Sequence, residues 1–184
     1  MEELALNILD IACNSVAANA TKVWISVSAD TAKDLLSISV KDNGRGMDKE
    51  FLSTVADPFA TTRKTRKVGM GIPLFKAAAQ VADGMFSIES EVGKGTETKA
   101  TFKLSHIDRM PLGDLASTVV TLIGTAGEAD IVFSYTVDTQ NYVFDTGEIR
   151  KVLNGVDINS PEIIVYIKDM IDENITRING GLIL

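Results

Sequence analysis

The first 104 residues combine helical and strand-like hydrophobic patterns. Apolar side chains recur at helical spacing over residues 2–18, and apolar and polar side chains then alternate over 23–28 and 35–40. The first pattern predicts an amphipathic helix, and the second predicts two half-buried strands joined as a hairpin. The pattern further predicts a short helix from Asp48, a helix that follows Gly69-Met70-Gly71 and runs through Val81, and strands at 86–91 and 98–104.

A second set of elements is expected beyond residue 106. The pattern predicts a helix at 114–123, strands at 129–137 and 141–145, and a short helix after Thr146. A final helix is expected where Ser160 can cap the N-terminus and Pro161 suits the first turn. Its buried face is expected to carry Ile163, Ile164, Ile167 and Ile171.

This order of elements implies helices layered on a mixed sheet, an α/β fold of the two-layer α+β sandwich type. We expect one domain over residues 1–106 and a small α+β accessory domain over 107–184. Residues 107–184 resemble no known family, and dimerisation or partner docking is inferred for them from composition alone.

Composition narrows the classes of function and partner. The net charge is −7, from 25 acidic and 18 basic residues, so nucleic acid is not the expected partner. No apolar run approaches the roughly 20 residues that span a bilayer. With a single cysteine, Cys13, a reducing environment fits best. We expect a soluble, cytoplasmic protein without membrane contact.

Two common phosphate-binding motifs are excluded by their spacing. A P-loop would need Ser or Thr after Gly93-Lys94, where Gly95 stands, and a first glycine at Ile88. The dinucleotide fingerprint needs a third glycine three residues after a Gly-x-Gly pair. Lys49 stands at that position after Gly44-x-Gly46, and Leu74 after Gly69-x-Gly71.

The helix of residues 2–18 places Asn7, Asp10 and Asn14 on one stripe. The run Asp10-Ile-Ala-Cys-Asn14-Ser-Val-Ala-Ala-Asn-Ala-Thr-Lys-Val resembles the N-box of the GHKL family (gyrase, Hsp90, histidine kinase, MutL). The resemblance implies that Asn14 coordinates Mg²⁺ through its amide oxygen. Asp10 stands where many members carry a glutamate that orients or deprotonates the attacking group. Aspartate is one methylene shorter, so hydrolysis could be slow.

The block Asp42-Asn43-Gly44-Arg45-Gly46-Met47 resembles the G1 box of the same family. The resemblance implies that Asp42 accepts a hydrogen bond from the adenine amino group, a contact that guanine cannot supply. Gly44 and Gly46 are expected to adopt positive φ and close beneath the base. Met47 could supply an apolar wall.

Three further blocks complete the resemblance. Asp57-Pro58-Phe59-Ala60-Thr61-Thr62-Arg63 resembles the F-box, Gly69-Met70-Gly71-Ile72 the G2 box, and Gly93-Lys94-Gly95-Thr96 the turn that closes the adenine site. In the family the segment between F-box and G2 box is a lid over the phosphates. The residues expected near the nucleotide from these blocks are Phe59, Thr62, Arg63, Lys67, Gly69, Gly71 and Thr96.

The resemblance therefore implies a Bergerat-type ATP-binding fold with ATP and Mg²⁺ as cofactors. One hypothesis is an enzyme that hydrolyses ATP or transfers its γ-phosphate to a separate protein, as anti-sigma serine kinases do. Another is an ATP-gated conformational module like MutL or the type II topoisomerases, since the Asn14 block is closer to the MutL form. A catalytically weak scaffold is a third, because of Asp10. The partner would be an unidentified protein or phosphoacceptor, and a homodimer is an option.

Overall fold

The computed structural model describes residues 3–55 and 71–182 of the chain. Within these ranges, helices and strands follow one another in the order that the sequence pattern predicts. The helices are α1 (Leu4–Ala17), α2 (Lys49–Thr54), α3 (Gly71–Val81), α4 (Leu115–Ala126), α5 (Thr146–Leu153) and α6 (Pro161–Asn179). The strands are β1 (Lys22–Asp30), β2 (Leu35–Asp42), β3 (Phe86–Glu91), β4 (Gly95–Lys103), β5 (Asp130–Val137) and β6 (Gln140–Asp145).

The strands form one mixed sheet in the order β3-β4-β2-β1-β5-β6. Neighbouring strands are antiparallel except β1 and β5, which run parallel. The parallel register sets Val23 beside Ile131 and Val27 beside Tyr135. The α/β fold class, with helices on a mixed sheet, is therefore confirmed.

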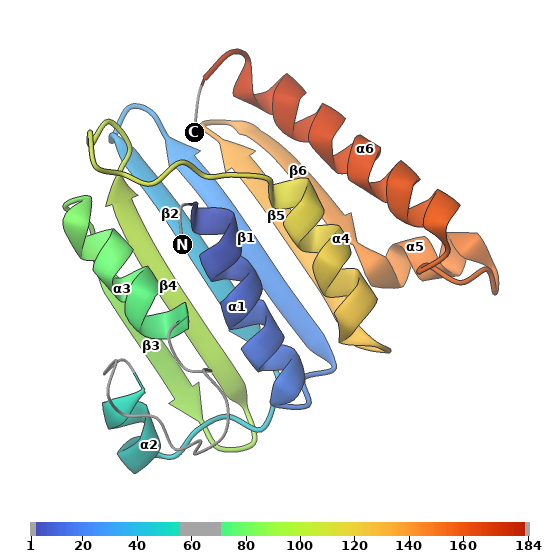
Figure 1. Ribbon diagram of the computed structural model, residues 1–184, viewed down its shortest axis with the longest axis horizontal. Coiled ribbons are helices and arrows are strands. Elements are labelled where there is room, and N and C mark those ends of the chain that lie inside the picture. Colours follow the sequence, from blue (N-terminus) through green and yellow to red (C-terminus); the bar gives the residue numbers. More distant parts are fainter. Residues whose placement is uncertain (1–2, 56–70, 183–184) are drawn as a thin grey trace.

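Helices α1, α3, α4 and α6 lie across one face of this sheet (Figure 1). Every second position of β1 and β2 is buried, because successive side chains of a strand point to opposite faces. Ile25 and Ile38 from the strands and Ile8 from α1 are almost completely buried in the layer between sheet and helices. This apolar layer holds α1, and the polar residues on it, at a fixed place over the sheet.

The segment after residue 106 is joined to the N-terminal segment through both layers. Strand β5 pairs with β1, α4 packs on α1, and α6 packs on α4. One hydrophobic cluster contains Leu4 and Ile8 of α1 together with Leu122 of α4 and Ile167 of α6. The boundary expected between residues 106 and 107 stays a prediction, and the structure adds that the segments on both sides share one sheet and one core.

Helix α6 begins where the sequence predicts, with Ser160 before it and Pro161 in its first turn. The Ser160 side chain makes no capping hydrogen bond, so the predicted side-chain cap is wrong. Pro161 has no N–H, which leaves one donor fewer to satisfy at this end. Ile167 and Ile171 are buried as expected, whereas the other two predicted face residues, Ile163 and Ile164, are only half-buried.

Among residues 3–55 and 71–182, no helix combines the length and apolar character that crossing a membrane requires.

Candidate functional site

Asp42 is the last residue of β2, and its side chain is buried, with 5% of its surface exposed. The Ser15 hydroxyl of α1 donates to Asp42 Oδ2 at 2.7 Å, and the Gly44 amide donates to Asp42 Oδ1 at 2.8 Å. Each carboxylate oxygen can accept a second hydrogen bond. The carboxylate is therefore fixed in direction and still able to accept from an amino group.

The segment Asn43–Met47, which follows β2, is attached to the structure on two sides. The Arg45 amide donates to the Ala18 carbonyl oxygen, just after α1, at 2.9 Å. The Met47 amide donates to Ser90 Oγ of β3 at 2.8 Å. The segment therefore spans from the end of α1 to the β3–β4 hairpin, and the half-buried Met47 lies between them.

Glycines allow this segment to approach the β3–β4 turn closely. A Cβ atom on Gly46 would overlap the Glu91 carbonyl oxygen, and one on Gly95 would overlap the Asp42 carbonyl oxygen. The predicted positive φ is confirmed at Gly46, at +65°, and is wrong at Gly44. Gly44 is instead constrained by close packing, because an added Cβ atom would lie 2.8 Å from the Ala18 carbonyl oxygen.

Helix α1 presents Asp10 and Asn14, both exposed and one turn apart, and Asp10 lies beside the start of α3. A Cβ atom on Gly71, the first residue of α3, would lie 2.8 Å from Asp10 Cβ and 3.2 Å from Asp10 Oδ2. Partial loss of water around the Asp10 carboxyl raises its pKa above the usual range. Asn7, on the same predicted stripe, is instead buried, at 1% exposure.

Thr96 of β4 follows Gly95 directly, and its hydroxyl is already engaged. Thr96 Oγ1 is 2.8 Å from Ser90 Oγ, and Ser90 Oγ donates to the Gly95 carbonyl oxygen at 3.0 Å. Thr98, two residues along the same strand face, is almost fully buried and pairs with Val40 of β2. A contact between Thr96 and a bound base stays a prediction, and Thr98 is a further hydroxyl on this face.

Five of the predicted site residues lie outside the described residues: Phe59, Thr62, Arg63, Lys67 and Gly69. Of the residues expected near the phosphates, the structure therefore describes Asp10, Asn14 and Gly71.

Sequence reasoning assigned no role to Ser15 or Ser90, which hold the site together. Ser15 sits on the apolar face of α1 with Ile8 and Ile11, where a lone hydroxyl signals a buried polar partner. Its partner, Asp42, is 27 residues away in the chain. The pattern therefore indicates that Ser15 has a buried polar partner but does not identify it. Ser90 stands in an alternating strand and carries no local signal.

ATP and Mg²⁺ fit the residues that the structure brings together. The buried Asp42 carboxylate keeps acceptor capacity toward an amino group, and a Cβ atom on the neighbouring Gly44 would lie 3.0 Å from its Oδ1. The exposed Asn14 side chain supplies an amide oxygen, and Mg²⁺ prefers oxygen ligands. Within the described residues, no three His, Cys, Asp or Glu side chains gather as a metal site.

Comparison with known proteins gives the family. Residues 1–106 match the family described as histidine kinase-, DNA gyrase B-, and HSP90-like ATPase. A sensor protein of Shewanella frigidimarina is 30% identical over 109 residues, covering 59% of this chain and 16% of that protein. Sporulation kinase D of Bacillus subtilis is 35% identical over 100 residues, covering 53% of this chain and 19% of the kinase. The chain thus spans less than a quarter of the length of these curated relatives.

A solved structure shares the fold. The N-terminal domain of a DNA repair protein superimposes with a TM-score of 0.53 at 14% identity, covering 78% of this chain and 52% of that one. At this identity the likeness concerns the fold alone. The family match, by contrast, covers more than half of the 184 residues and includes Asp10, Asn14 and Asp42. The chain therefore belongs to the family of histidine kinase-, DNA gyrase B-, and HSP90-like ATPases.

Proposed function

We propose that the chain binds ATP together with Mg²⁺ and uses it for phosphoryl chemistry, by hydrolysis or by transfer of the γ-phosphoryl group to a separate protein. The observation that carries this proposal is Asp42, a buried carboxylate held by Ser15 and by the Gly44 amide, at the place where Gly46 and Gly95 let the segment after β2 and the β3–β4 turn pack closely. Burying a charge is costly unless it is hydrogen-bonded. A site that keeps such a group aimed at one place is suited to recognising a donor there.

Residues of α1 would hold and activate the reacting groups. Asn14 would bind Mg²⁺ through its amide oxygen, and the ion would neutralise charge on the phosphates. Asp10, one turn earlier on the helix, would accept the proton of the attacking water or hydroxyl. The raised pKa of Asp10 favours this role, because a more basic carboxylate is a better proton acceptor.

Transfer to another protein is favoured by the relatives. Sporulation kinases C and D of Bacillus subtilis are kinases by name, at 32% and 35% identity over the matched region. The single histidine, His106, lies in the turn after β4 with its Nε2 3.5 Å from Asp83 Oδ2. We propose that the acceptor is a side chain of a different protein.

A second candidate function is an ATP-gated conformational module. The observation that favours it is the parallel pairing of β1 with β5, together with the packing of α4 against α1. The helix that carries Asp10 and Asn14 thereby contacts the segment after residue 106 directly. Movement of α1 on nucleotide binding would then change the position of α4 and α6.

Substitution of Asp10 separates the two functions. We expect Asp10→Asn to lower steady-state ATP turnover by about 100-fold or more, the range for loss of a general base. We expect Asp10→Glu to keep or raise turnover, since glutamate is the longer acid. Both variants should bind ATP as the wild type does, because Asp42 is unchanged. The measurement is phosphate release, or phosphoryl transfer to candidate acceptors, at saturating Mg·ATP.

Equal turnover in the wild type and both variants would remove Asp10 as the base. Tight ATP binding without turnover in all three proteins would favour the conformational module. Asp48→Asn is a suitable control, because Asp48 is an exposed carboxylate whose side chain accepts from the Phe51 amide at the start of α2.

A further inference from the structure

The N-terminus of α1 is capped by backbone from another part of the chain. Glu3, at the cap position, makes no side-chain capping hydrogen bond. The Leu4 amide instead donates to the Pro111 carbonyl oxygen at 3.0 Å, and the Ala5 amide donates to the Leu112 carbonyl oxygen at 2.8 Å. The first amides of a helix have no partner within the helix, so these carbonyls satisfy two of them.

We propose that residues 110–113, here called the capping linker, are a positioning element of the ATP site. This inference rests on the proposed function, because the groups that it positions are Asp10 and Asn14. The capping linker lies beyond residue 106, where the family match ends. The nucleotide site would thus depend on residues outside the matched region.

The helix is the means by which the capping linker acts on the site. Asp10, Asn14 and Ser15 all project from α1, and Ser15 holds Asp42. A hydrogen-bonded helix moves as a rod, with about 1.5 Å of rise per residue. A shift of its capped end along the axis therefore moves Asn14 by the same amount. Displacements near 1 Å are enough to impair positioned groups.

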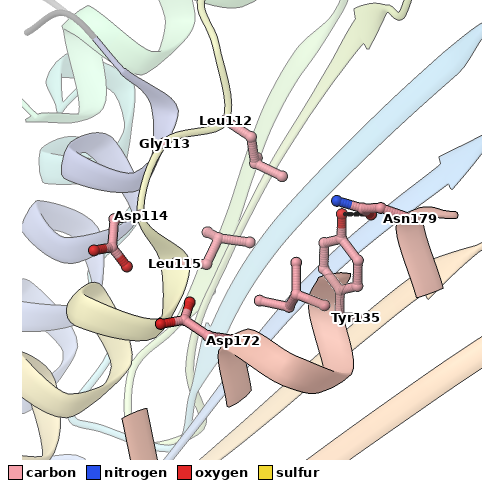
Figure 2. A pocket seen from close by; sticks show the side chains of 8 residues that line it. Leu112, Gly113, Asp114, Leu115, Tyr135, Asp172 and Asn179 are labelled. Carbon is pink, nitrogen blue, oxygen red and sulfur yellow. Dashed lines mark hydrogen bonds between the residues drawn. The ribbon is translucent and has the colours of Figure 1, made fainter. Parts of the chain in front are cut away.

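Gly113 fixes the shape of the capping linker. Its φ is +82°, a conformation that side chains rarely allow, and an added Cβ would also meet the Glu3 carboxylate. The linker also borders a cavity of about 140 Å³ lined by Leu112, Gly113, Leu115, Tyr135 and Asn179, among others. Figure 2 shows these residues around the cavity, where the Tyr135 hydroxyl donates a hydrogen bond to Asn179 Oδ1 at 2.6 Å. Because the cavity adjoins Leu112 and Gly113, the linker backbone has space to move when Gly113 is replaced.

The test compares Gly113→Ala with Gly155→Ala in the full chain. Gly155 also has positive φ, at +96°, with open space around it, and it lies in the loop after α5. Isothermal titration gives the affinity for ATP with and without Mg²⁺, and the ratio of the two is the magnesium gain. We expect Gly113→Ala to reduce the magnesium gain by about tenfold, the low end of the loss seen when groups that orient a metal ligand are changed. Gly155→Ala should keep the wild-type gain.

Each outcome has a distinct meaning. If Gly113→Ala and Gly155→Ala both keep the magnesium gain of the wild type, the positioning role is overturned and the proposed function stays intact. A wild type that binds ATP without any magnesium gain overturns the assignment of Asn14, and the inference with it. If Gly113→Ala does not fold, hydrogen exchange of the Leu4 and Ala5 amides in the wild type tests whether the capping linker is coupled to the nucleotide site. Slower exchange with Mg·ATP than with ATP alone supports the coupling, and equal exchange overturns it.

Discussion

Asp42→Ala is expected to lower the affinity for ATP by about 10- to 150-fold. The estimate follows from losing a hydrogen bond to a charged group, which is worth about 1.5–3 kcal/mol, or one to two powers of ten in affinity. The effect should be large because the lost carboxylate is buried and already oriented by Ser15 and Gly44. Isothermal titration with Mg·ATP measures it directly, with circular dichroism to confirm the fold.

Two further variants separate recognition from folding. Ser15→Ala keeps the Asp42 carboxylate but removes one of its donors, so it should weaken ATP binding less than Asp42→Ala does. Ser39→Ala changes a β2 hydroxyl on the opposite sheet face from Asp42 and should leave affinity unchanged. ATP affinity that survives Asp42→Ala within a factor of about two would remove Asp42 as the adenine acceptor.

Gly95→Ala is expected to lower the free energy of unfolding by about 2–5 kcal/mol, the sum of backbone strain and overpacking. Its φ is +105°, and the new Cβ would overlap the Asp42 carbonyl oxygen. Relief would require β4 to move away from the end of β2, which carries Asp42. Urea denaturation monitored by circular dichroism gives the change, and ATP affinity should fall with it.

Gly93→Ala is the matched control for this substitution. Gly93 lies two residues earlier in the same turn with φ +79°, but a Cβ atom added to it would meet nothing within 4 Å. It should therefore lose only the backbone term, about 1–2 kcal/mol. Equal losses in the two variants would contradict a close contact between Gly95 and the end of β2.

The pattern of the sequence predicts local structure well where one face of an element is buried. Residues 23–28 and 35–40 alternate because β1 and β2 bury every second side chain under the helices. Alternation also predicts β5, but not its place beside β1. Parallel neighbours are brought together by a long crossover, and no short turn signal marks them.

The candidate site likewise has features that the local sequence predicts and features that depend on tertiary packing. The Asp42 block ends a strand and carries its glycines at fixed spacing, so its place at the end of β2 follows from local sequence. The partners of this block do not, since Ser15 and Ser90 reach it only through tertiary packing. Gly44 illustrates the difference, because the limit there is the nearby Ala18 carbonyl oxygen, and not its own φ.

The cap of α1 likewise lies outside the reach of local pattern. The sequence offers no Ser, Thr, Asp or Asn immediately before Leu4, and the amides are satisfied by Pro111 and Leu112. Backbone carbonyls carry no sequence signal, so only the folded chain shows such a cap.

Adenine recognition is tested most directly by titrating the wild-type chain with ATP and with GTP, each with Mg²⁺. We expect ATP to bind with a dissociation constant well below about 1 mM, and GTP to bind at least about tenfold more weakly, since guanine carries a carbonyl oxygen where adenine carries the amino group that would donate to Asp42. Absence of ATP binding in this range, or equal affinity for the two nucleotides, would contradict an adenine site at Asp42.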